Sequence, residues 1–195
     1  MSRTALPYNE NELYSLTMLN QQHVEEYRSL RLESLQESPL AFSDSYEDLA
    51  EWPHEAFAKE LEWRGTPPEC FVLAAMQNKR PVGFLRFQRD VRSKGRHKAY
   101  VHSMYVQPAH RKQGLGRHML GYLQHHAPEL KGLEQIHLWV LHSHTSATGF
   151  YQSCGYQSQG TRVKNDLKIG DTYVDAEYMV LELASAPQYP AKAHE

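Results

Sequence analysis

The sequence contains little cysteine, with only Cys70 and Cys154 among 195 residues. The two lie far apart and in no spacing typical of metal ligands, which disfavours both a disulfide framework and a cysteine-based metal site. Such low cysteine usage fits a reducing compartment, so we expect a cytoplasmic protein.

Long apolar runs and a strong net charge are also missing. No segment approaches the roughly 18 consecutive apolar residues of a membrane helix. Residues 1–11 are polar and lack the charged-then-apolar order of a secretory signal. The formal net charge of -2 at pH 7 gives no general attraction for nucleic acid. We therefore expect neither a membrane nor a nucleic-acid partner.

The composition that is present belongs to a folded chain, with 41% hydrophobic and 23% charged residues. The length suits one domain with one sizeable core. We expect this domain to cover residues 1–183. Residues 184–195 contain two prolines and little to bury, so we expect them to form a flexible C-terminal tail.

Hydrophobic periodicity predicts the order of the elements. We expect strands over residues 14–19, 71–76, 81–87, 99–106, 136–141, 156–163 and 173–183. We expect helices over residues 21–36, 45–63, 114–126 and 145–153. Antiparallel strands followed by a strand–helix–strand unit predict an α/β fold built on one mixed sheet.

The sharpest local feature is a glycine-containing turn between a predicted strand and a predicted helix, over residues 106–117. Gly114 and Gly116 allow backbone amides to approach a ligand without an intervening Cβ. The start of the helix adds a partial positive charge. Residues 91–128 also hold seven Lys or Arg and no Asp or Glu. Together these features predict a site for a polyphosphate.

Two common phosphate motifs do not match this turn. A P-loop requires Gly-Lys-Ser/Thr, whereas Gly116 is followed by Arg117-His118. A dinucleotide fingerprint requires a small residue at Met119 and an acid that closes the next strand, whereas Glu134 precedes that strand. A glycine-containing helix start with no ligand is the remaining alternative at this point.

Together with its neighbours, the turn resembles motif A of the GNAT superfamily, Arg/Gln-x-x-Gly-x-Gly/Ala, which stands here as Arg111–Gly116. Four further segments resemble that family in the same order along the chain. They are the first helix and following loop at residues 31–42, the fourth strand at residues 100–108, the Asn-x-x-Ala-x-x-x-Tyr-x-x-x-Gly-Phe segment at residues 144–156, and the last strand at residues 173–181.

This resemblance implies a mostly antiparallel sheet that is splayed between its fourth and fifth strands and flanked by helices. It also implies that acetyl-CoA is the co-substrate, with the turn amides around its pyrophosphate and the backbone of Met104 and Val106 along its pantetheine arm. His144 stands where the family usually has an asparagine. The implied cofactor contacts are Met104, Tyr105, Val106, Arg111, Lys112, Gln113, Gly114, Leu115, Gly116, Arg117 and His144.

Two residues are candidates for proton transfer during amine acetylation. Tyr151 matches the family's position for protonating the CoA thiolate, with reference pKa values of roughly 10 for a phenol and 8.5 for a thiol. His102 is the candidate base, because a histidine titrates near neutrality. Strand alternation predicts that Tyr100, His102 and Met104 share one face of the sheet. The alternatives are a core tyrosine and a structural histidine.

No metal is expected. Histidine pairs occur at His125-His126 and at His142 and His144, but neither pair has a third ligand at a recognisable spacing. The family resemblance also implies no metal.

The acceptor implied by the resemblance is a primary amine of a small molecule or a peptide, acetylated directly in a ternary complex. In this family the acceptor site is built by the first two helices and the late strands. The candidates to line it are Phe42, Tyr46, Tyr100 and Asp175. A CoA-binding sensor without catalysis is the alternative function, and a homodimer is left open.

Overall fold

A computed structural model describes residues 13–141 and 145–183 of the chain. They form a seven-stranded sheet in the order β1-β2-β3-β4-β5-β7-β6. Neighbouring strands pair antiparallel except for β4 and β5, which are parallel. The strands are β1 (Ser15–Met18), β2 (Cys70–Gln77), β3 (Arg80–Arg89), β4 (Lys98–Val106), β5 (Gln135–Leu141), β6 (Gln157–Ile169) and β7 (Thr172–Glu182). The predicted mixed α/β fold is confirmed.

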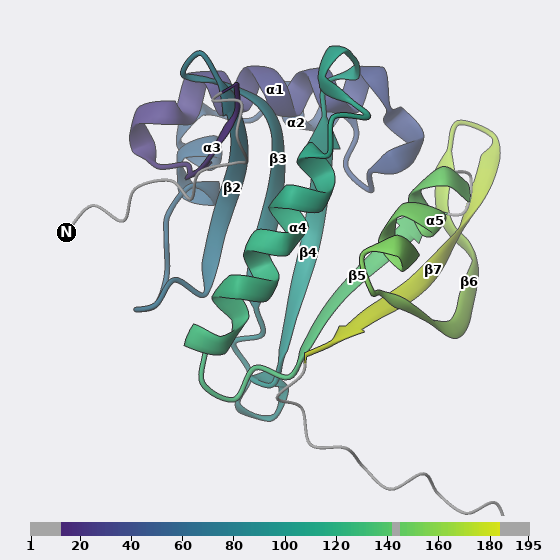
Figure 1. Ribbon diagram of the computed structural model, residues 1–195. Coiled ribbons are helices and arrows are strands. Elements are labelled where there is room, and N and C mark those ends of the chain that lie inside the picture. The colour runs from purple at the N-terminus through teal and green to yellow at the C-terminus, as the bar shows by residue number, and fades with distance from the viewer. Residues whose placement is uncertain (1–12, 142–144, 184–195) are drawn as a thin grey trace, which may run out of the picture.

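Helices cover both faces of this sheet (Figure 1). One face, here called the α1 side, carries α1 (Val24–Glu37), α2 (Tyr46–Ala50) and α3 (His54–Glu60). The other face, the α4 side, carries α4 (Leu115–His126) and α5 (Thr145–Ser153). Across the described residues, no helix has the length and apolar character required to cross a membrane.

The two faces enclose separate hydrophobic cores, and the alternation of β2 shows how one strand supplies both. Phe71 and Leu73 point to the core under α4, whereas Val72 and Ala74 point to the core under α1. All four are fully buried. This explains why β2 is a continuous apolar run rather than an alternating one, since neither of its faces meets water.

The predicted helix over residues 45–63 is wrong, because the chain forms two short helices there. α2 ends at Ala50, and Pro53 is the extended residue that precedes α3. Proline has no amide hydrogen, and it disfavours the helical conformation at the residue before it, here Trp52. The apolar spacing continues through the break, which is why periodicity alone merged the two helices.

β6 extends beyond its predicted end and forms a long hairpin with β7. The strand reaches Ile169, and its pairing with β7 shifts register twice. Asn165 has a positive φ of 55° and its amide donates to Asp175 at 3.0 Å. These irregular polar residues resemble a loop in the sequence, which explains the short prediction.

The predicted splay between β4 and β5 is confirmed. The two strands pair only over Lys98–Tyr100 and residues 135–137, and then diverge (Figure 1). Beyond Tyr100, the β4 edge that faces β5 has no strand partner in the described part of the chain. The two strands therefore form a V, with Tyr100 and His137 at its vertex.

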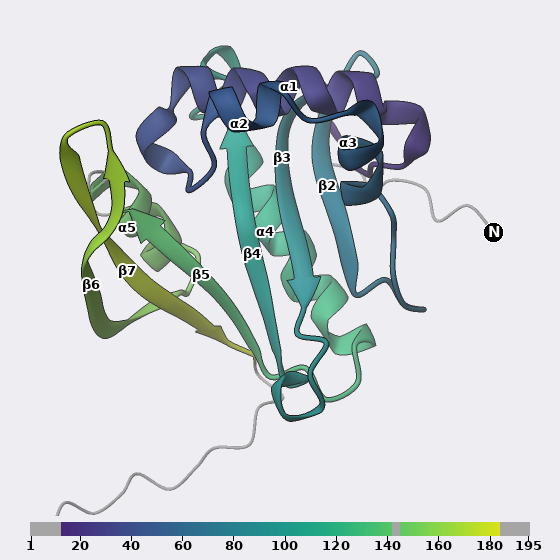
Figure 2. The same cartoon turned by 180° about the vertical axis from the view of Figure 1, so that it is seen from behind.

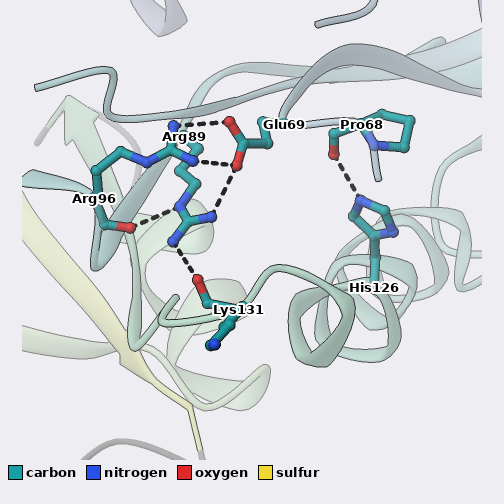
Figure 3. Close-up of polar contacts among 6 residues, drawn as sticks. All are labelled: Pro68, Glu69, Arg89, Arg96, His126 and Lys131. Carbon is teal, nitrogen blue, oxygen red and sulfur yellow. Dashed lines mark hydrogen bonds and ion pairs between the residues drawn. The ribbon is translucent and has the colours of Figure 1, made fainter. Parts of the chain in front are cut away.

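A buried arginine network stabilises the paired end of these strands (Figure 3). Arg89 donates to Glu69 at 2.8 Å, to the Arg96 carbonyl at 2.6 Å and to the Lys131 carbonyl at 2.7 Å. Arg96 also pairs with Glu69, and this contact is the main cause of the lowered pKa of Glu69. Nearby, His126 bonds the Pro68 carbonyl at 2.8 Å. The network links the loops that precede β4 and β5, and thereby fixes the vertex.

Candidate active site

A β-bulge in β4 changes which side chains face each side of the sheet. Arg86 of β3 pairs with Ser103, but the next β3 residue pairs with Val101, so His102 is an extra residue in β4. Val101 points to the α4-side core before the bulge, and Met104 packs against that same core after it. The expectation that Tyr100, His102 and Met104 share a face is therefore wrong.

The bulge separates the candidate site into two halves. Tyr100 and His102 lie together on the α1 side, with ring centroids 5.8 Å apart. Met104 lies on the α4 side, where it meets α4 and α5. A molecule placed in the splay between β4 and β5 would thus contact His102 on one side and Met104 on the other.

The glycine turn lies on the α4 side of the sheet, at the start of α4. Gly114 immediately precedes α4 with φ of 79°, a left-handed conformation that favours glycine, and Lys112 also has a positive φ of 61°. No side chain among the described residues caps the first turn of α4 at Gly114. The amides of this turn are therefore presented at a helix N-terminus, as an anion site requires.

Gly116 allows this turn to lie close to β4 and α5. A Cβ at Gly116 would come within 2.9 Å of the Met104 methyl carbon and 3.0 Å of the Phe150 ring. Arg117 ties the same turn to the end of α5 by donating to the Ser153 carbonyl at 2.7 Å and to the Ser153 hydroxyl at 2.9 Å. β4, the start of α4 and α5 therefore meet around Gly116.

Tyr151 projects from α5 toward β4. Its hydroxyl donates to the Met104 sulfur at 3.7 Å, and its ring lies 5.8 Å from that of Tyr156. Burial raises the pKa of Tyr151 to about 12, with a smaller contribution from Cys154. The phenol is therefore protonated throughout the physiological pH range and can act as a hydrogen-bond or proton donor.

His102 has the opposite electrostatic character. Its side chain is solvent-accessible, but the surrounding protein reduces its hydration, which lowers its pKa, and the Arg86 guanidinium lowers it further. Asp44 opposes this shift. At neutral pH the imidazole is consequently uncharged and able to accept a proton.

The remaining predicted cofactor residues surround the turn, but their charges are not equally available. Arg111 pairs with Glu37 at 2.6 Å and donates to the Val106 carbonyl at 2.9 Å, so its charge is largely offset. Tyr105 is buried beneath the Arg111 guanidinium. The side chains of Lys112 and Gln113 are exposed, whereas Leu115 is a core residue of α4. His144 lies outside the described residues.

The predicted acceptor residues are not brought together as a group. Phe42 is buried beneath Arg31, whose guanidinium lies 5.0 Å from its ring centroid, and Tyr46 packs against the same core. Tyr100 lies at the vertex beside His102. Asp175 points away from the buried side of β7 and accepts from the Asn165 amide. Among the described residues, no cluster of three His, Cys, Asp or Glu side chains could hold a metal.

Three residues near the vertex, His137, Trp139 and Tyr178, were not predicted from the sequence. On β5, Ile136, Leu138 and Val140 enter the α4-side core, so His137 and Trp139 face the other side. This alternation was visible in the sequence, but it did not indicate that β7 would place Tyr178 opposite Trp139.

The model of the acetyltransferase (GNAT) family matches residues 30–156, which include β4, the glycine turn and α5. The chain belongs to this family. This GNAT protein is therefore an acetyltransferase, and the predicted family membership and enzyme class are confirmed. A search of curated proteins finds no match.

Solved structures of acetyltransferases share its fold at low sequence identity. The Salmonella typhimurium protein yncA, with its cofactor acetyl-CoA, is 17% identical, with a TM-score of 0.69 over 92% of this chain and 99% of its own. The ribosomal-protein-S18-alanine N-acetyltransferase from Escherichia coli is 21% identical, with a TM-score of 0.64 over 92% and 99%. An N-acetyltransferase from Staphylococcus aureus Mu50 is 13% identical, with a TM-score of 0.67 over 87% and 98%.

Proposed function

We propose that this protein transfers an acetyl group from acetyl-CoA to a primary amine, directly and in a ternary complex. The observation that carries the proposal is the convergence of three features at the β4–β5 splay. They are the left-handed glycine turn at the start of α4, the open edge of β4, and the Tyr151 hydroxyl directed at Met104.

The residues around the splay fit acetyl-CoA. The turn amides from Lys112 to Arg117 would hold the pyrophosphate, because they combine a positive-φ turn with an uncapped helix start. The backbone of Met104–Val106 would bind the amide-bearing pantetheine arm in place of the missing β5 pairing. Acetyl-CoA, when bound, supplies the acetyl group as a thioester. The complex of the similar yncA with acetyl-CoA supports this ligand for the fold.

The two candidate residues have protonation states that suit amine acetylation. The amine nitrogen forms a bond to the thioester carbonyl carbon while the carbon–sulfur bond breaks. His102, uncharged at neutral pH, accepts the proton that the amine loses, directly or through water. Tyr151 donates a proton to the departing sulfur. Burial raises the pKa of a thiol as it does that of a phenol, so the high pKa of Tyr151 does not by itself oppose this transfer.

The bulge at His102 places the proposed base and the proposed acid on opposite sides of the sheet. Because His102 faces the α1 side and Tyr151 lies on the α4 side, the amine would approach the thioester from one side while the sulfur departs toward the other. The Tyr151 hydroxyl already donates to one sulfur, that of Met104. The same hydroxyl is therefore suited to donate to the sulfur of CoA.

A thiol-release assay with acetyl-CoA and a panel of primary amines tests the proposal. Gly114→Glu places an L residue at a positive φ and a negative charge in the anion site, so we expect loss of both acetyl-CoA binding and turnover. Gly121→Glu on the same helix is the matched control, since a Cβ there meets nothing within 4 Å. It should retain activity.

Two outcomes would contradict the proposal. An unchanged rate in Gly114→Glu would exclude the turn as the cofactor site. Acetyl-CoA binding by the wild type without turnover on any amine would instead indicate a CoA-binding sensor.

A further inference from the structure

Five rings form a continuous strip across the vertex of the splay on the α1 side. Neighbouring ring centroids lie 5.8 Å apart for Tyr100 and His102, 5.5 Å for Tyr100 and His137, 5.3 Å for His137 and Tyr178, and 4.5 Å for Trp139 and Tyr178. We call these residues the aromatic strip. They come from β4, β5 and β7, which are far apart in the sequence.

The aromatic strip begins at the candidate base and ends at an accessible indole. His102 and Trp139 each lie two residues beyond the last β4–β5 pair, on the two diverging strands. Trp139 is 50% exposed, although it lies in the middle of a strand. Figure 2 shows that α1, α2 and α3 cross only the upper part of this face and leave the region near the vertex uncovered. The two ends of the strip, His102 and Trp139, are therefore exposed to solvent.

The centre of the aromatic strip is held rigidly. His137 is buried, and both of its ring nitrogens are bonded, Nδ1 to the Tyr178 hydroxyl and Nε2 to Gln135 at 3.0 Å. The Tyr178 ring is thereby fixed beside Trp139. Flat, preorganised rings of this kind bind another planar ring with little further loss of side-chain freedom.

The charges around the aromatic strip disfavour a strongly cationic ligand. Lys98 lies close enough to His137 to affect its ionisation. Three carboxylates near this face are each paired with an arginine, and Glu182 accepts a hydrogen bond from Gln135 at 2.8 Å. These pairs are Asp44 with Arg31, Glu60 with Arg86, and Asp90 with Arg92. A multiply charged amine would meet mostly carboxylates that are already paired with an arginine, whereas an aromatic ring would find complementary faces.

We propose that the aromatic strip is the acceptor subsite and that it selects amines carried on an aromatic ring through a short aliphatic chain. The ring stacks against Trp139 and Tyr178, and the amine reaches the thioester beside His102. This inference rests on the proposed function and names the class of its acceptor. Acetyl transfer to such an amine follows the same bond and proton changes described above.

Competition between matched amines tests the subsite. Phenethylamine and 2-cyclohexylethylamine have the same chain length, but only the first has a planar ring, and spermidine supplies a multiply charged alternative. We expect the wild type to prefer phenethylamine over both in kcat/KM. Trp139→Leu should reduce the preference for phenethylamine over 2-cyclohexylethylamine by about 3- to 10-fold, the range expected for loss of one aromatic contact. The KM for acetyl-CoA should not change.

Trp63→Leu is the matched control. Trp63 is 47% exposed, and its indole donates to the Leu19 carbonyl, away from the aromatic strip. This variant should keep the wild-type ratio between the two amines, and the ratio does not depend on how much of either variant is folded. Equal use of the two amines, a preference for spermidine, or an unchanged ratio in Trp139→Leu would overturn the inference.

Failure of the proposed function would be seen separately, as the absence of thiol release with every amine. In that case, saturation-transfer NMR with phenethylamine and saturating acetyl-CoA tests the aromatic strip alone. Binding to the wild type that is lost in Trp139→Leu would support an aromatic-ring subsite. Absence of binding to the wild type would overturn it.

Discussion

Tyr151 and Tyr156 show how position decides the role of a residue type. Both tyrosines lie at the end of α5 or just beyond it, and their rings are 5.8 Å apart. The Tyr151 hydroxyl reaches the Met104 sulfur at the splay, whereas that of Tyr156 is buried without a hydrogen-bond partner in the described part of the chain. Of these two tyrosines, Tyr151 is therefore the one that fits the proposed role of protonating the CoA sulfur.

This contrast gives a matched pair of variants. Tyr151→Phe should lower kcat by about 10²-fold or more, the range for loss of a general acid, with little change in the KM for acetyl-CoA. Tyr156→Phe should leave kcat unchanged and leave stability unchanged or slightly higher, because it removes an unsatisfied buried hydroxyl. Steady-state kinetics and thermal unfolding check both. Equal kcat values for Tyr151→Phe and the wild type would remove Tyr151 from the mechanism.

His102 predicts the pH dependence of the reaction. A base must be uncharged to accept a proton, and the pKa of His102 is lowered by reduced hydration and by Arg86. The kcat/KM for the amine should therefore show an acidic inflection that lies under about 6.5, the ordinary histidine value. Deprotonation of the amine itself adds a separate rise at higher pH.

His102→Gln should lower kcat/KM by about 10² to 10⁴-fold and abolish the acidic inflection. His125→Gln removes an exposed imidazole on α4 and should keep the wild-type profile. An acidic inflection that persists in His102→Gln would assign it to another group.

Helices and strands could be predicted where the residues that determine them lie close together in the sequence. The glycine turn, the strand before it and α5 were placed correctly because their signals lie within a few residues: Gly114, Pro108 and the spacing around Tyr151. The prediction of one long helix over residues 45–63 is wrong at Pro53. Proline there ends the helix, but the apolar spacing on either side suggested that the helix continued.

The bulge in β4 could not be predicted from the strand itself. It exists because β3 pairs with Ser103 and then with Val101, and this register is a property of two strands together. Simple alternation along the strand therefore predicted that His102 and Met104 share one face of the sheet. The correction matters for function, because it puts the candidate base and the candidate acid on different sides of the splay.

At the scale of the whole molecule, the site is produced by a sheet that is closed at one end and open at the other. The Arg89 network fixes the loops that precede β4 and β5, so the two strands start paired. α4 and α5 then converge on the α4 side, while the aromatic strip forms across the vertex on the α1 side. The proposed cofactor site and the proposed acceptor subsite therefore lie on opposite sides of the sheet.

The aromatic strip could be predicted from the sequence only in part. His137 and Trp139 could be assigned to one face of a strand from alternation, but their partner Tyr178 lies about forty residues later, on the strand that β5 pairs with. The acceptor side therefore required the topology of the sheet, whereas the cofactor side was largely contained in one continuous motif.

Direct transfer at the splay can be tested by initial rates measured while acetyl-CoA and the best amine of the panel are varied together. Cofactor and acceptor sites on opposite sides of the splay would allow both substrates to bind before any product leaves. Double-reciprocal plots should then give intersecting lines. Parallel lines would show that the acetyl group is first passed to the protein, and would contradict direct transfer in a ternary complex.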